Sequence, residues 1–247
     1  MHRRTVALAF LAGLVALSGC AGITDSSPTD TTTDVDVSAD AVQADTLAAM
    51  AAVTSYEFSA DLQQDLGTLT TDISLTGVVN LTAERMSQKT TVTATRGDRS
   101  NAATTETYVV DDTAYIRSQG VWQTRPVPER TWNNTPVDRQ AQFLTDAAVT
   151  VLNKTTVAGV ETYALAVEPD PATVEAYIEN RRSVRGDVTV ESVSVTQYVA
   201  VDTHRIRTAT LDMTATINGQ TLDQTLTITF SEYGADTDIT VPEAATT

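Results

Sequence analysis

The chain has 247 residues, of which 32 are Asp or Glu and 16 are Lys or Arg, so its formal net charge is −16. Proteins that bind nucleic acid neutralise phosphates with Lys and Arg, so this composition argues against a nucleic-acid partner. Cys20 is the only cysteine, which excludes an intramolecular disulfide as a source of stability.

The N-terminus has the pattern of a lipoprotein signal peptide. Arg3 and Arg4 precede an apolar run, Val6–Leu17, which is too short to span a bilayer. The sequence LSGC then places two small residues directly before Cys20, whose thiol can accept a diacylglyceryl-type lipid. An ordinary secretory peptide with an incidental cysteine is the alternative. We predict a signal peptide over residues 1–19 and a lipid on Cys20.

Export and location follow from this signal. Arg3 and Arg4 resemble the start of a twin-arginine signal, although a general secretory signal also carries paired arginines. No second apolar stretch is long enough to cross a bilayer, so the lipid is the expected attachment to the outer face of the cytoplasmic membrane. We predict a disordered tether, rich in Thr and Asp, over 20–37, a folded domain over 38–242, and a flexible tail over 243–247.

The charge pattern indicates an acidic, salt-adapted surface. Lys89 and Lys154 are the only lysines, and acids occur along the whole chain. This balance resembles haloarchaeal-type proteins, in which salt screens the repulsion between surface carboxylates. An acidic tail in an ordinary organism is the alternative interpretation.

The first part of the domain predicts one helix and then a run of strands. The helix begins near Asp40 as cap, with Gln43 reaching back, and runs to about Val53. From Ser55 the hydrophobic period changes to two, which is typical of half-buried strands. Short adjacent strands favour an antiparallel meander. The expected strands are 55–63, 70–81, 85–95, 104–110, 113–117 and 121–125.

Two further helices are predicted after these strands. One has Thr135 as cap and Pro136 at its first position, and its apolar spacing continues through Leu144 to Ala148 and Val151. The other runs from Asp170-Pro171 to Arg181-Arg182. A strand is expected between them, at about 161–167.

The C-terminal third predicts a hairpin with a defined register. Asn218-Gly219 is typical of a type I′ turn, because both residues accept positive φ. Counting outward pairs Ala215 with Leu222 and Leu211 with Leu226. A preceding strand, 188–201, changes its apolar phase near Glu191-Ser192, which predicts a bulge.

Several stretches resemble the LolA and LppX/LprG-like lipoproteins in order and spacing. The resemblance covers about Ser55 to Pro242. It rests on LTGVVN at 75–80 with Arg85-Met86, YIR at 115–117 with GVW at 120–122, GVETYAL at 159–165, VDT at 201–203 and FSEYG at 230–234.

The resemblance implies an α+β fold, in which a single strongly curved antiparallel sheet forms an open half-barrel with helices on its concave face. It also implies lipid or amphiphile binding between the sheet and the helices, without catalytic residues or a cofactor. A structural or protein-interaction module with a filled core is the alternative function. Residues that either line such a cavity or belong to the core are Leu47, Met50, Phe58, Phe143, Leu144 and Tyr177.

Other chemistry is weakly represented. His204 is the only histidine after the signal peptide and lies in an expected turn, where a solvated side chain is the common role. We find no motif of a hydrolase, nucleotide-binding protein or metal site. Asn80, Asn133 and Asn153 begin glycosylation sequons, of which Asn133 is followed by an unfavourable Pro136.

We predict that the mature chain begins at Cys20 and carries at least two acyl or isoprenoid chains there, because one chain anchors only marginally. Mass spectrometry of the native protein measures this modification. The Cys20→Ser variant is expected to leave the membrane fraction. An unmodified Cys20, or a variant that stays fully membrane-bound, would contradict the prediction.

Overall fold

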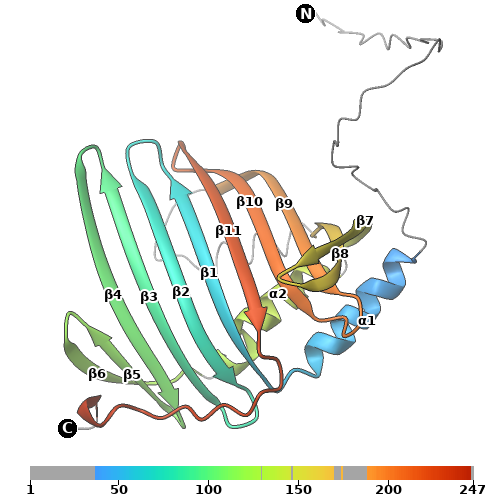
Figure 1. Cartoon of the computed structure of the whole chain (residues 1–247). Helices are drawn as coiled ribbons and strands as arrows, with labels where there is room; N and C mark the ends of the chain where they lie inside the picture. Colours follow the sequence, from blue (N-terminus) through green and yellow to red (C-terminus); the bar gives the residue numbers. More distant parts are fainter. Residues whose placement is uncertain (1–36, 129, 146, 170–173, 175–187, 246–247) are drawn as a thin grey trace, which may run out of the picture. The chain divides into compact units, whose positions relative to one another are not determined.

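The computed structural model describes residues 37–128, 130–145, 147–169, 174 and 188–245. The chain divides into two units, 1–31 and 32–247, and all described residues belong to the second. The elements, shown in Figure 1, are α1 Ala39–Ala51, β1 Ser55–Asp65, β2 Thr70–Asn80, β3 Arg85–Arg96, β4 Arg99–Val110, β5 Thr113–Ser118, β6 Val121–Pro126, η1 Thr131–Asn133, α2 Pro136–Leu144, β7 Ala148–Val157, β8 Val160–Glu168, β9 Val188–Ala200, β10 Ile206–Ile217, β11 Gln220–Ser231 and η2 Glu243–Ala245.

All eleven strands form one open antiparallel sheet, in the order β6-β5-β4-β3-β2-β1-β11-β10-β9-β8-β7. Two meanders, β1 to β6 and β7 to β11, therefore meet where the first strand pairs with the last. The sheet is curved, and α2 lies behind it in Figure 1, on the concave side. This confirms the predicted half-barrel with helices on its concave face.

The β10–β11 hairpin has the predicted register. Ala215 pairs with Leu222 and Leu211 with Leu226. Asn218 and Gly219 have φ values of 50° and 78°, as a type I′ turn requires. The predicted bulge is also present, since β9 pairs Ser192 with Thr214 and Val190 with Ala215, leaving Glu191 unpaired.

Aromatic packing holds the two meanders together. Phe58 of β1 lies opposite Phe230 of β11. The Tyr56 ring contacts Phe230 edge-on, with ring centroids 5.8 Å apart, and Tyr233 stacks on Phe230 at 6.2 Å. The Tyr233 hydroxyl donates to the Ile206 carbonyl at 2.6 Å. Tyr56 and Phe230 are fully buried, so this cluster forms the centre of the core.

The helices contact the concave face through both apolar and polar groups. Val42 and Met50 of α1 and Val137, Phe143 and Leu144 of α2 are buried in the core. The Gln197 amide of β9 donates to the Gln140 carbonyl of α2 at 3.0 Å. This hydrogen bond holds α2 against β9.

The start of α1 differs from the prediction. Its N-cap is Ser38, whose hydroxyl accepts from the Ala41 amide, so Asp40 lies in the first turn and is not the cap. Gln43 does not reach back either. Its amide donates to the carbonyls of Leu144 and Ala147, because the end of α2 brings two carbonyls within reach of α1.

The predicted end of the second helix is wrong. Thr135 and Pro136 begin α2 as expected, but α2 ends at Leu144, and Ala148 and Val151 belong to strand β7. Their helical spacing matched by coincidence. The segment AVTV pairs with β8, where its β-branched residues are favoured. The helix expected from Asp170 to Arg182 lies outside the described residues, apart from a helical, buried Val174.

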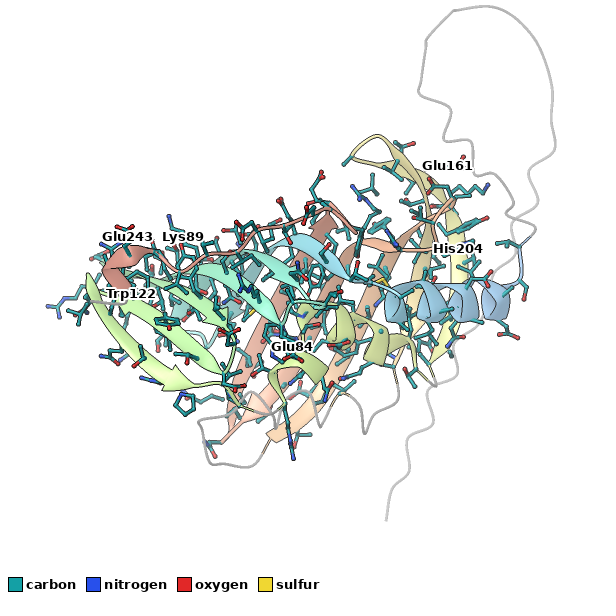
Figure 2. The ribbon with its side chains drawn as sticks, turned by 90° about the horizontal axis from the view of Figure 1, so that it is seen from below. Glu84, Lys89, Trp122, Glu161, His204 and Glu243 are labelled. Atoms are coloured by element: carbon teal, nitrogen blue, oxygen red, sulfur yellow. The ribbon has the colours of Figure 1, made fainter. Side chains whose placement is uncertain are left out.

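After β11 the chain crosses the strand ends, in front of the sheet in Figure 1, whereas α2 lies behind the sheet. Three side chains donate to the carbonyls of this segment: Ser55 to Ala235, Asn80 to Thr237 and Arg85 to Ile239. The segment ends in η2, which contacts β6 and contains Glu243, labelled at the sheet's end in Figure 2. It therefore ties β1, β2, β3 and β6 together. Within the described residues, no helix combines the length and apolarity needed to cross a bilayer.

We predict that Gly77→Ala lowers the free energy of unfolding by about 1–3 kcal/mol, as overpacking does. A Cβ at Gly77 would lie 2.5 Å from Cε1 of Phe58, its partner across β1 and β2, and 2.8 Å from the Ser87 carbonyl oxygen. Denaturant unfolding measures the loss. In a Phe58→Ala background the cost of Gly77→Ala should shrink, and an equal cost in both backgrounds would contradict this explanation.

Candidate functional site

An apolar hollow of about 220 Å³ lies between the concave face and α2. It exists because alternate residues of β1, β2 and β11 face inward, as in every half-buried strand. Arg139 and Gln140 of α2 close the opposite side. The hollow is lined by Phe58, Ala60, Leu62, Ile73, Leu75, Gln88, Pro136, Arg139, Gln140, Leu226 and Ile228.

A second hollow of about 310 Å³ adjoins the first. It lies between β3 and the segment that leads into α2. Gln88, Pro136 and Arg139 line both hollows, so together they form one interrupted groove, which we call the inner groove. Its second part is lined by Met86, Gln88, Pro128, Arg130, Thr131, Trp132, Asn134, Thr135, Pro136 and Arg139.

The start of α2 positions the shared residues. A capping box joins Thr135 and Asp138: the Thr135 amide donates to Asp138 Oδ2 at 2.9 Å, and the Asp138 amide donates to Thr135 Oγ1 at 3.5 Å. Pro136 fits the first helical position because it has no N–H to satisfy. Arg139 Nη1 donates to the Asn134 carbonyl at 2.8 Å, which holds this guanidinium near the groove.

The sheet side of the inner groove changes in polarity along the row that contains Phe58. Phe58 pairs with Gly77, and Gly77 with Gln88. The Phe58 ring therefore lies over a position without a side chain, beside a polar amide. The Gln88 amide donates to Thr90 Oγ1 at 2.9 Å, which fixes it on the concave face.

Tyr56 lies beside the start of α2 and is held in its neutral form. Burial raises its pKa to about 12, against smaller opposing effects of the Thr135 side chain and the Val137 backbone. Burial also raises the pKa of Tyr233, with a further contribution from Tyr56. The wall of the core behind the groove is therefore uncharged over the physiological range.

The sequence-predicted ligand residues are distributed unevenly. Phe58 lines the apolar hollow. Met50, Phe143 and Leu144 are buried in the core, and Leu47 packs partly buried against it. Tyr177 lies outside the described residues. The sequence analysis did not predict Gln88, Trp132 or Arg139 as site residues. Neither the helical nor the strand periodicity of the sequence distinguishes them from other polar or surface residues.

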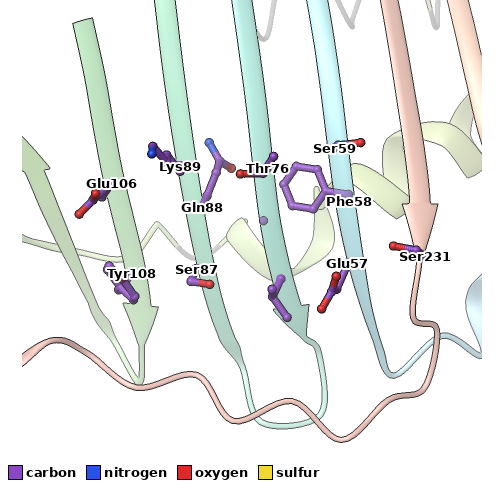
Figure 3. Close-up of a pocket in the computed structure, with 12 residues that line it drawn as sticks. Glu57, Phe58, Ser59, Thr76, Ser87, Gln88, Lys89, Glu106, Tyr108 and Ser231 are labelled. Carbon is purple, nitrogen blue, oxygen red and sulfur yellow. The ribbon is translucent and has the colours of Figure 1, made fainter.

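A larger hollow, about 390 Å³, lies mainly on the opposite, convex face (Figure 3). Most of its lining side chains are polar and come from neighbouring strands, such as Glu57, Lys89 and Glu106. Beside it Arg117 is 3.5 Å from Glu106 and lies over the Trp122 ring at 5.9 Å. This open polar surface is unsuited to an apolar chain.

The remaining chemical candidates are dispersed. His204 Nε2, labelled in Figure 2, lies 3.8 Å from Asp45 Oδ2 of α1, and both side chains are partly exposed. The described residues contain no group of three or more His, Cys, Asp and Glu side chains placed to hold a metal. Of the sequons, Asn80 is engaged with Thr237 and Ala83, Asn133 is exposed and Asn153 is half-buried.

Comparison with known proteins identifies the fold. No family model and no curated protein sequence matches the chain. The lipoprotein LppX of Mycobacterium tuberculosis has a similar structure, with a TM-score of 0.52 and 15% identity over 82% of this chain and 100% of LppX. LprF of Mycobacterium bovis gives a TM-score of 0.53 and 15% identity over 83% of this chain and 96% of LprF. The chain therefore has the LppX-like half-barrel fold.

We predict that Tyr56 makes stability fall with rising pH in the alkaline range. Because its folded pKa of about 12 exceeds the unfolded value of 10.0, its contribution is complete below pH 10 and disappears as pH rises towards 12. Thermal unfolding midpoints measured across this range should fall less steeply in Tyr56→Phe than in the wild type. Equal slopes would contradict the assignment.

Proposed function

We propose that this chain is an exported lipoprotein that holds the apolar part of a lipid or other amphiphile in the inner groove and performs no catalysis. The observation that carries the proposal is the 220 Å³ hollow, whose walls are mostly Phe, Leu, Ile and Ala side chains. The shared fold with LppX, itself described as a lipoprotein, supports an extracytoplasmic role.

Cys20 completes this proposal. A lipid on Cys20, after export through Arg3 and Arg4, would attach the domain to the outer face of the cytoplasmic membrane, with residues 20–37 as tether. The acidic composition, −16 over the whole chain, supports a haloarchaeal-type member of the LolA and LppX-like superfamily. The domain over 38–242 would then work in the envelope, close to membrane lipids.

One observation favours the second candidate function, a structural or protein-interaction module. The apolar hollow alone is smaller than the roughly 300–1,000 Å³ of typical ligand sites. It reaches that range only together with the adjoining 310 Å³ hollow. Lipid extraction and mass spectrometry of the purified protein separate the two candidates, because a module with a filled core carries no specific amphiphile.

We predict that Leu75→Trp reduces co-purifying amphiphile by about tenfold or more, because the larger side chain fills the hollow without adding charge. Leu75 is partly buried and lines the hollow, so a folded variant is expected. The control is Leu152→Trp, the same change at a position that is 51% exposed on β7. Amphiphile is quantified per folded protein, and equal loading of the two variants would contradict a ligand in the hollow.

A further inference from the structure

We propose that the ligand of the inner groove is an anionic amphiphile, with its carboxylate or phosphate head at Arg130 and Arg139. This inference rests on the proposed function and adds the charge of the ligand. Arg130 and Arg139 both line the second hollow, and Arg139 also lines the apolar one.

The charge of the groove is opposite to that of the chain. Acids outnumber cations by two to one in the sequence, with 32 Asp and Glu against 16 Lys and Arg. The described residues that line the two hollows nevertheless include two arginines and no Asp or Glu. A cationic groove on an acidic protein concentrates anions at that place and repels cations.

The arrangement matches the two ends of an amphiphile. The apolar hollow accepts the chain, while Gln88 and Arg139 stand at the boundary of the two hollows. The Asn134 carbonyl, 2.8 Å from Arg139 Nη1, orients that guanidinium before any ligand binds. Arginine suits carboxylate and phosphate because its planar fork presents paired N–H donors.

The apolar rim of the second hollow provides a reporter. Trp132 lines it, and Trp122 on β6 is the only other tryptophan in the sequence. In a Trp122→Phe background the intrinsic tryptophan fluorescence therefore reports on the groove alone. The mature chain, residues 20–247 with Cys20→Ser, serves as the protein, so that neither anchor nor detergent is needed.

The experiment compares three probes that carry the same alkyl chain: dodecyl phosphate, dodecanol and dodecyltrimethylammonium. The two ionic probes are used below their critical micelle concentrations and dodecanol below its solubility limit. Dodecyl phosphate is expected to bind about tenfold more tightly than dodecanol, as a charge-assisted contact implies. The ammonium probe is expected to bind more weakly than dodecanol. Inorganic phosphate at the same concentration should not compete, and competition would contradict an amphiphile site.

Arginine variants test the assignment of the head group. The double variant Arg130→Gln, Arg139→Gln should lower the affinity for dodecyl phosphate about tenfold and that for dodecanol much less, because Gln keeps part of the Arg139 wall of the apolar hollow but no charge. Arg139→Lys should retain part of the preference, since it keeps the charge. The control is Arg117→Gln, which removes one charge on the convex face, where Arg117 pairs with Glu106. An equally large loss of dodecanol binding in the double variant would indicate a structural role only and overturn the assignment.

The outcomes separate the two proposals. If the wild-type chain binds none of the three probes, the proposed function fails. If dodecanol binds but dodecyl phosphate binds no more tightly, or if its advantage survives in the double variant, the anionic head group is wrong while the apolar site stands.

Discussion

The pairing of β1 with β11 is the contact on which the rest of the structure depends. Within both meanders each strand pairs with the next strand along the sequence, whereas β1 and β11 are separated by most of the domain. Nine residue pairs, from Glu57–Ser231 to Asp65–Asp223, hold this junction. One end of this junction is packed by three aromatic rings, those of Tyr56, Phe230 and Tyr233. Burial of their apolar area offsets the conformational entropy that is lost when such distant strands are brought together.

The junction also determines where a groove can form. Inward residues are mostly apolar on β10, β11 and β1, apart from the hydrogen-bonded pair Gln64 and Gln224, and α1 and α2 pack against the apolar ones. On β3 the inward row contains the polar residues Gln88 and Thr90 between Met86 and Val92, and all four are only partly buried. The helix cover therefore ends where the sheet loses its apolar character. The inner groove lies at this boundary, with apolar side chains on one side and polar groups on the other.

Strand phase and turn chemistry were sufficient to predict most of the sheet. Asn218-Gly219 fixed the hairpin register, and the phase change at Glu191 located the bulge. The helix that begins at Pro136 was wrongly predicted to include Ala148 and Val151, because helical spacing in a short apolar run does not exclude a strand. Phe58 was predicted as a ligand residue, whereas Gln88 and Arg139 were not. Their role depends on β3 and the start of α2 lining the same hollows, an arrangement of distant segments that no local pattern encodes.

The size of the apolar hollow explains why its polar boundary matters. At roughly 30 Å³ for a water-sized group, 220 Å³ holds about seven methylenes. Burying them contributes about 5–6 kcal/mol at about 0.8 kcal/mol each. Association costs roughly 4 kcal/mol or more, so the chain alone leaves a net binding free energy of about 2 kcal/mol or less. A charge-assisted contact adds about 1.5–3 kcal/mol, which improves affinity roughly tenfold to a hundredfold. Useful retention of an amphiphile therefore requires the head-group end of the groove as much as its apolar end.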